Sequence, residues 1–122
     1  MDSSRRTILL VDDSADTLEP LARLLKMSGY DVRLARTAAE ALQLAAAPGP
    51  VDLMISDLGL PDRDGTDLMR EVKAQFGLRG IALTGYSGDD TARDCRSAGF
   101  DRHFIKPIHF EDLRTAVGEL LP

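Results

Sequence analysis

The sequence predicts an α/β fold, built as a single domain over residues 1–122. Five short apolar runs, each bounded by polar or turn residues, are typical of buried strands. Segments with apolar residues at helical spacing lie between these runs, so strands and helices alternate along the chain. The composition, with 43% hydrophobic and 29% charged residues, is ordinary for a globular domain with one core. These three observations favour one sheet covered by helices.

The strands are expected where apolar runs stop abruptly at polar residues, at positions 7–11, 31–35, 52–56, 80–83 and 102–105. The helices are expected between them, at about positions 14–28, 38–47, 65–76, 88–98 and 110–120. Strand–helix alternation implies a parallel sheet with helices on both faces. Right-handed crossovers leave few topologies, and the flavodoxin-like strand order 2-1-3-4-5 suits five units. The predicted architecture is a three-layer (βα)5 sandwich.

The helix starts carry specific signals. Ser14 can cap the first helix, but Pro20 lies inside its apolar pattern. Because proline cannot donate a backbone hydrogen bond, either the first turn bends or the regular helix begins nearer Pro20. Thr37 with Glu40 three residues later is a capping box, which predicts the start of the second helix.

The fourth helix is unusual because its inward candidates, Ala92, Cys95 and Ala98, are all small. Burial of such side chains stabilises a helix less than the roughly 1.5–3 kcal/mol of a buried Leu or Phe. We expect a weakly held helix that can shift, a property suited to a switch. The alternative, a helix packed close to the sheet through small side chains, stays equally open.

Five polar side chains follow four of the expected strands directly. Asp12 and Asp13 follow the first, Asp57 the third, Thr84 the fourth and Lys106 the fifth. The carboxyl ends of parallel strands share one edge of a sheet, where open α/β folds bind ligands. Clustered carboxylates repel one another unless a cation is present, and Mg²⁺ prefers oxygen ligands. We therefore expect Asp12, Asp13, Asp57 and a backbone carbonyl, Gly59 by position, to bind Mg²⁺, or Mn²⁺ in its place.

Asp57 is the candidate nucleophile, because a carboxylate can attack phosphorus and form an acyl phosphate. The cation, the Lys106 ammonium and the Thr84 hydroxyl would neutralise the charge on the equatorial oxygens. Each residue also has an ordinary interpretation. Asp12 and Asp13 could form an acidic first helical turn, Lys106 could be an exposed lysine, and the Thr84 hydroxyl could bond to its own backbone. Their occurrence at successive strand ends favours the phosphoryl-transfer interpretation.

The motifs in order resemble the receiver domain of two-component response regulators. They are Val-Asp-Asp (11–13), Ser-Asp-Leu-Gly-Leu-Pro-Asp-Arg-Asp-Gly (56–65), Ala-Leu-Thr-Gly (82–85) and Ile-Lys-Pro (105–107). The resemblance covers nearly the whole chain. It implies a domain that accepts a phosphoryl group on Asp57 from a phosphohistidine on a sensor histidine kinase or a histidine phosphotransfer protein. It is a signalling function, not that of a metabolic enzyme.

The same resemblance assigns further roles. Asp12, Asp13, Asp57 and the Gly59 carbonyl hold Mg²⁺, and Thr84 and Lys106 bind the phosphoryl group. The Lys106–Pro107 bond is expected to be cis. Thr84 couples to a ring three residues before the lysine, here His103, and the fourth helix, fifth strand and last helix form the output surface.

Some positions depart from the family's usual residues. His103 stands where Tyr or Phe is common, and since imidazole titrates near pH 6.5, we hypothesise that the position of its ring depends on pH. A surface ring without a switching role is the alternative. By the same resemblance, Gly59 and Tyr86 occupy positions that tune the lifetime of the phosphoryl group in that family. The sequence segments 83–87 and 99–107 resemble those of receivers attached to hybrid sensor kinases. We expect the chain to be either a stand-alone receiver or part of a longer protein.

Other classes fit less well. A haloacid dehalogenase-type phosphatase, the main alternative, also uses Asp, Thr and Lys but needs a second acid where Gly59 stands. A flavin-binding domain would place phosphate after the first strand, where Asp12 and Asp13 would repel it. The net charge of −5 argues against direct nucleic-acid binding, and no apolar run approaches the roughly 20 residues of a membrane span. A single cysteine fits a reducing compartment, so we expect a cytoplasmic location.

Overall fold

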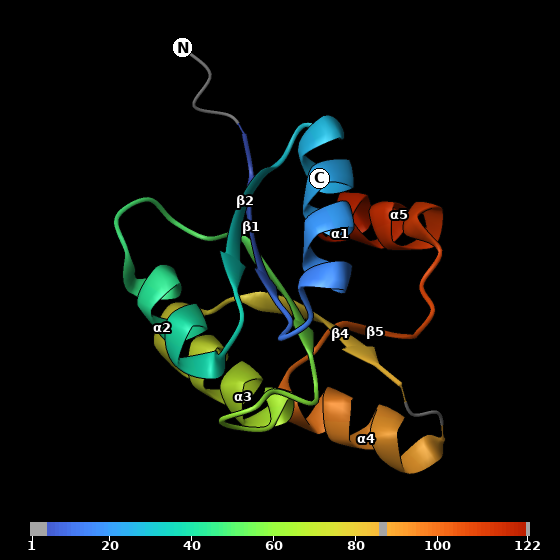
Figure 1. Cartoon of the computed structure of the whole chain (residues 1–122). Helices are drawn as coiled ribbons and strands as arrows, with labels where there is room; N and C mark the ends of the chain where they lie inside the picture. Colours follow the sequence, from blue (N-terminus) through green and yellow to red (C-terminus); the bar gives the residue numbers. More distant parts are fainter. Residues whose placement is uncertain (1–4, 86–87, 122) are drawn as a thin grey trace.

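The computed structural model describes residues 5–85 and 88–121 (Figure 1). Five parallel strands form one sheet in the order β2-β1-β3-β4-β5. The strands are β1 (Thr7–Val11), β2 (Asp31–Ala35), β3 (Leu53–Asp57), β4 (Arg79–Thr84) and β5 (Arg102–Ile105). The helices are α1 (Ala15–Met27), α2 (Ala38–Ala46), α3 (Gly65–Phe76), α4 (Asp89–Ala98) and α5 (Phe110–Leu120). The predicted fold class and strand order are confirmed.

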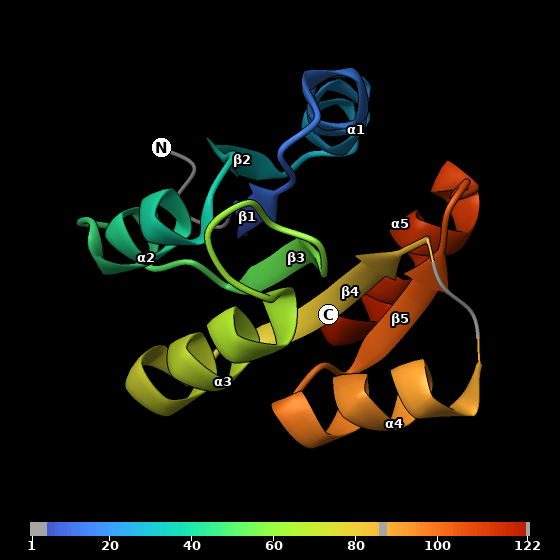
Figure 2. The same ribbon diagram turned by 60° about the horizontal axis from the view of Figure 1, so that its bottom comes forward.

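The helices cover both faces of the sheet, as Figure 2 shows. One core lies between the sheet and helices α1 and α5, where Leu25 and Leu113 pack against Ile55 and other inward residues of the strands. The second core lies on the opposite face, where Leu68 and Met69 of α3 pack with Met54. Most residues of the central strands β1 and β3 are apolar because helices bury both faces of these strands.

The first helix excludes one of the two expectations for Pro20, a regular helix that begins nearer that residue. It begins at Ala15 and continues through Pro20. Pro20 cannot donate to the carbonyl of Asp16, but both residues are exposed, so water can replace the missing donor. Ser14 occupies the N-cap position, yet among the described residues its hydroxyl makes no capping hydrogen bond. Its backbone N–H instead donates to Oδ1 of Asp12, which ties the start of α1 to the end of β1.

The capping box of α2 is present with one change. Oγ1 of Thr37 accepts a hydrogen bond from the N–H of Glu40 at 3.0 Å, as expected. The Glu40 carboxylate accepts a hydrogen bond of 2.8 Å from the N–H of Arg36, the residue before the cap, and not from the N–H of Thr37 itself. The sequence pattern therefore located the helix start correctly.

Helix α4 buries only Cys95 and Ala98 among its described side chains, whereas Ala92 is half-buried. Burial, together with the charge of the neighbouring Asp94, raises the pKa of the Cys95 thiol, which therefore stays protonated as part of the packing. The apolar contact of α4 with the sheet is small, as the sequence predicted. Whether this helix shifts remains a prediction.

Strand β2 forms one edge of the sheet, and its side chains are less buried than those of the adjacent strand β1. Leu34 is 41% exposed. Arg33 reaches from this strand to the end of α2, where its guanidinium donates to the carbonyl oxygens of Leu44, Pro48 and Gly49. Leu44 lies in the last turn of α2 and Pro48 and Gly49 in the loop that follows, so Arg33 ties this loop to β2.

Candidate functional site

Two acidic residues follow β1 directly and differ in burial. Asp12 is 1% exposed, and its N–H donates to the carbonyl of Ala35 at 3.1 Å, which continues the pairing of β1 with β2. Asp13 is exposed at the surface of the same turn. A carboxylate as buried as Asp12 requires hydrogen-bond donors or a cation, and the Ser14 N–H supplies one donor.

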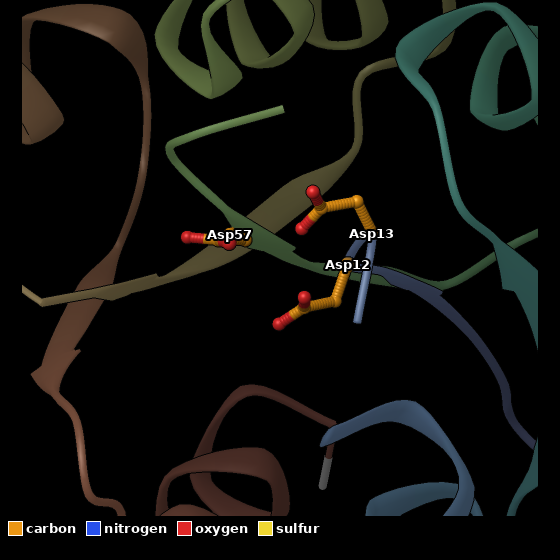
Figure 3. A group of neighbouring side chains, drawn as sticks. All are labelled: Asp12, Asp13 and Asp57. Atoms are coloured by element: carbon orange, nitrogen blue, oxygen red, sulfur yellow. The ribbon is translucent and has the colours of Figure 1, made fainter. Parts of the chain in front are cut away.

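Asp57 is the last residue of β3 and its side chain is 14% exposed. Its carboxylate and those of Asp12 and Asp13 offer oxygens that all lie within 4.8 Å of one another (Figure 3). The strand order makes this cluster possible, because β1 and β3 are adjacent in the sheet although the residues are far apart in sequence. The structure therefore brings together the three acids that the sequence singled out.

Lys106 supplies the positive charge of the cluster. Its Nζ lies 3.0 Å from Oδ2 of Asp12 and 3.3 Å from Oδ2 of Asp57. Burial of the ammonium, the largest single influence, lowers the pKa of Lys106. The hydrogen bond and charge of Asp12, with the charge of Asp57, outweigh it and leave the pKa above its ordinary value. Lys106 is therefore charged at neutral pH. The bond from Lys106 to Pro107 is cis, as expected.

Thr84 ends β4 and is 1% exposed. Its carbonyl accepts a hydrogen bond of 2.7 Å from the N–H of Lys106, so the two residues adjoin at the same edge of the sheet. Gly59 lies in the loop after β3, and its N–H donates to Oδ1 of Asp57 at 3.3 Å. The sequence-predicted residues of the site thus converge on one edge, at the ends of β1, β3, β4 and β5.

The loop after β3 is folded tightly against the site. The N–H of Gly65 donates to the carbonyl of Leu58 at 2.8 Å, and Gly59 pairs with Asp64 in an antiparallel bridge. A Cβ at position 65 would collide with the Asp57 carbonyl oxygen and the Leu58 Cα. Glycine is needed here because the start of α3 approaches the backbone at Asp57 closely.

His103 is half-buried on β5 and pairs in register with Ala82, two residues before Thr84. Side chains two residues apart on a strand point to the same face of the sheet. Ala82 belongs to the core that includes Cys95 of α4, so His103 and Thr84 share the α4 side of the sheet. Tyr86, the other position with an expected tuning role, lies outside the described residues.

The donor set fits a hard divalent cation. Carboxylates from the loop after β1 and from the end of β3 offer oxygen ligands within one small volume, and Mg²⁺ is bound by one or two carboxylates with its remaining positions filled by water. Mn²⁺ accepts the same ligands. Cysteine and histidine are absent from the described cluster, so its chemistry favours these metals over zinc.

Sequence analysis missed two residues beside the site. Asp62 accepts hydrogen bonds from the N–H groups of Ala38 and Ala39, at 2.9 and 3.0 Å, at the start of α2. These two bonds lower the pKa of the Asp62 carboxyl. Arg36 donates from its guanidinium to the carbonyl oxygen of Asp13 at 3.0 Å. In the sequence, Asp62 and Arg36 look like ordinary charged residues of two loops, so no pattern predicts these contacts.

Comparison with known proteins agrees with this geometry. Residues 8–118 match the family model described as the response regulator receiver domain. Sporulation initiation phosphotransferase F of Bacillus subtilis is 29% identical over 116 residues, which cover 94% of this chain and 93% of that protein. Response regulator protein PilR of Pseudomonas aeruginosa is 35% identical over 97% of this chain. Sensor kinase CckA of Brucella abortus is 33% identical over 98% of this chain.

The chain spans only 26% of that PilR and 13% of that CckA, so most of each relative has no counterpart here. A receiver domain protein from Methanospirillum hungatei has the same fold, with a TM-score of 0.87 and 33% identity. The match covers 97% of this chain and 94% of that one. No helix in residues 5–85 and 88–121 is long and apolar enough to cross a membrane. The chain belongs to the response regulator receiver domain family, whose members act in two-component signal transduction.

Proposed function

We propose that Asp57 accepts a phosphoryl group from a phosphohistidine donor, with Mg²⁺ or Mn²⁺ held by Asp12, Asp13, Asp57 and the carbonyl of Gly59. The observation that carries this proposal is the position of Lys106. Its ammonium lies within 3.3 Å of two of the three clustered carboxylates. A fixed cation beside a cation-binding acid cluster is the arrangement that phosphoryl transfer requires.

In the proposed reaction an Asp57 oxygen forms a bond to phosphorus while the bond from phosphorus to the donor imidazole nitrogen breaks. The electron pair of that bond leaves with the imidazole, and Asp57 becomes an acyl phosphate. A metal ion held by Asp12, Asp13 and Asp57 would supply countercharge to the phosphoryl group. Lys106 would turn from Asp12 toward a second oxygen, and the hydroxyl of Thr84 would donate to a third. These residues position the group and neutralise its charge.

The donor partner is proposed to be a sensor histidine kinase or a histidine phosphotransfer protein. A groove of about 540 Å³ between α1 and α5 supports a docking place for it. Leu21, Leu24, Ile108 and Phe110 line this groove. Lys106, whose ammonium contacts Asp12 and Asp57, lines it too. A partner seated on these apolar side chains would bring its phosphohistidine to Asp57.

The proposed output is a change in the surface formed by α4, β5 and α5, controlled by Thr84 and His103. Movement of Thr84 toward a phosphoryl group would vacate space on the α4 side of the sheet, which the His103 ring can enter. This surface presents Ile105, which is 45% exposed, and an ion pair of 2.8 Å between Arg102 and Glu119. Both would be available to a partner protein.

Other functions find less support. A haloacid dehalogenase-type phosphatase needs an acid where Gly59 stands, and we infer that the domain catalyses only its own phosphorylation and dephosphorylation. The acidic charge balance supports a protein partner and not direct contact with nucleic acid or insertion into a membrane. We place the domain in the cytoplasm, where its proposed kinase donors present phosphohistidine.

Acetyl phosphate and Mg²⁺ test the proposed phosphoacceptor. We expect the wild type to take up one phosphoryl group per chain, as measured by intact-protein mass spectrometry. Asp57→Asn should abolish the uptake while circular dichroism shows an unchanged fold. Stoichiometric labelling of Asp57→Asn at another residue would contradict the assignment. Turnover of phosphomonoesters by the wild type would favour the phosphatase instead.

A phosphorylated histidine kinase domain tests the donor and its groove. Leu24→Glu places a charge in the groove without touching the acid cluster. This variant should slow transfer from the phosphohistidine protein while leaving labelling by acetyl phosphate unchanged. Equal slowing with both donors would argue against docking in the groove.

A further inference from the structure

The proposed metal ligands come from two separate segments of the chain. Asp12 and Asp13 belong to the connection between β1 and α1, and Asp57 and Gly59 to the end of β3 and the loop that follows it. Mg²⁺ requires near-ideal octahedral geometry with ligand distances of about 2.0–2.1 Å. Affinity for the ion therefore depends on how firmly the two loops are held relative to each other, as well as on the ligands themselves.

The start of α2 contacts both loops. The Arg36 guanidinium donates to the backbone carbonyl of Asp13 at 3.0 Å, in the first loop. Asp62, in the second loop, receives the N–H groups of Ala38 and Ala39 at 2.9 and 3.0 Å. Figure 2 shows the loop between β3 and α3 arching toward this end of α2. A single helix start thus bridges the two segments that carry the metal ligands.

The bonds of Asp62 are strong for a surface residue. Each carboxylate oxygen receives one backbone N–H, and both donors lie at the positive end of the α2 dipole. The lowered pKa of Asp62 reflects these bonds. Thr37 caps the next N–H, that of Glu40, from within the β2–α2 connection itself. The helix start therefore has a local cap, Thr37, and a second cap that comes from another loop.

We propose that Asp62 is a positioning residue for the metal site: its carboxylate fastens the loop after Asp57 to the start of α2 and so sets the affinity for Mg²⁺. This inference rests on the proposed Mg²⁺ site. Asp62 is not a ligand, and it acts through the loop that contains Gly59. Loss of partners outside the ligand shell weakens metal binding by about 10–100-fold when they touch a ligand directly. Asp62 is more remote, so we expect about 3- to 10-fold, below that range.

The test compares Mg²⁺ dissociation constants by isothermal titration of metal-free protein, at a temperature where circular dichroism shows each variant to be folded. Asp62→Ala should weaken Mg²⁺ binding about 3- to 10-fold, and Asp62→Asn, which keeps one acceptor oxygen, should fall between it and the wild type. In two matched control variants the Mg²⁺ dissociation constant should stay within about twofold of the wild-type value, since neither variant removes the hydrogen bonds between Asp62 and the start of α2. Thr37→Ala removes the local cap of the same helix, and Asp64→Asn removes a charge from the same loop.

A second readout follows the loop directly. The Gly65 N–H donates to the carbonyl of Leu58 and so reports on closure of the loop. Its hydrogen exchange should accelerate in Asp62→Ala and stay unchanged in Thr37→Ala. A merely structural cap would affect both variants alike.

The outcomes separate the two proposals. Unchanged Mg²⁺ affinity in Asp62→Ala, or equal weakening in Thr37→Ala or Asp64→Asn, would overturn the positioning role and leave the metal site intact. Undiminished Mg²⁺ binding by Asp13→Asn, or none by the wild type, would instead overturn the proposed metal site and the role of Asp62 with it.

Discussion

The Nζ atom of Lys106 lies 3.0 Å from Oδ2 of Asp12, a carboxylate that is 1% exposed, although the two residues are 94 positions apart. The ion pair joins the end of β5 to the end of β1, which are not neighbours in the sheet. Without a metal ion, Lys106 is the cation that offsets the repulsion among the three acids. The ammonium therefore supports the fold before it takes part in any reaction.

The first prediction concerns this ion pair. Lys106→Ala should lower the free energy of unfolding by about 1–3 kcal/mol, because it leaves the buried carboxylate of Asp12 without its counterion. Saturating Mg²⁺ should recover much of the loss, since the ion supplies the missing charge. Urea denaturation with and without Mg²⁺ measures both effects. Lys26→Ala, at an exposed position on α1, serves as the control and should change little. If Mg²⁺ did not reduce the loss in the free energy of unfolding of Lys106→Ala, this explanation would be contradicted.

The second prediction compares two glycines. Gly65→Ala should destabilise the domain by about 1–3 kcal/mol, because its Cβ would collide with backbone atoms at Asp57 and Leu58. Gly118→Ala, at an exposed position in the last turn of α5, meets no atom within 4 Å and should stabilise the domain by about 0.5–1 kcal/mol. Thermal denaturation of both variants under one condition provides the measurement. Stabilisation by both substitutions would show that the close approach at Gly65 is unimportant.

The third prediction is a dependence on pH. The hydrogen bonds from Ala38 and Ala39 hold the pKa of the Asp62 carboxyl below its ordinary value of 3.8. A lowered pKa in the folded state contributes stability that is present above the unfolded pKa and lost as the pH falls through the folded pKa. The wild type should therefore be more stable than Asp62→Asn above about pH 5, and the difference should shrink toward about pH 2. Urea midpoints across this range test the sign, and a difference that grows on acidification would refute it.

The fourth prediction concerns helix α4. It buries Cys95 and Ala98, whereas α5 buries Leu113, Ala116, Val117 and Leu120. Because less apolar surface holds α4 to the sheet, its amides should exchange with solvent faster than those of α5. Hydrogen exchange followed by mass spectrometry measures both helices in one experiment. Equal protection would show that close packing of small side chains holds α4 firmly, which is the alternative left open by the sequence.

Much of the site could be predicted from the sequence because its residues follow strands. The apolar runs before Asp12, Asp57 and Thr84 identify the strands, and the α/β pattern places the ends of those strands at one edge. Local signals also located the start of α2, since Thr37 caps a bond only three residues away. The bounds of helices and strands that were predicted from nearby residues or from apolar periodicity were therefore accurate to within about two residues.

Contacts between loops could not be predicted in the same way. Asp62 accepts hydrogen bonds from residues 23 and 24 positions away. These bonds depend on the paths of the β2–α2 and β3–α3 loops, whose sequences have no periodic pattern. The start of α1 was uncertain for a related reason: the penalty for Pro20 depends on whether the Asp16 carbonyl can reach water, which tertiary structure decides. The role proposed for Asp62 accordingly came from the structure alone.

Strand β2 leaves one side of its backbone unpaired at the rim of the sheet, a place where another molecule's strand could attach. Charged side chains at Asp31 and Arg33 interrupt its apolar residues, and Arg33 is engaged with the carbonyls at the end of α2. Charges on a rim strand hinder intermolecular pairing. The same arginine that binds the end of α2 and the following loop thus helps to protect the domain against aggregation. Its replacement by valine would leave an uninterrupted apolar stretch from Val32 to Ala35 open to fibril formation.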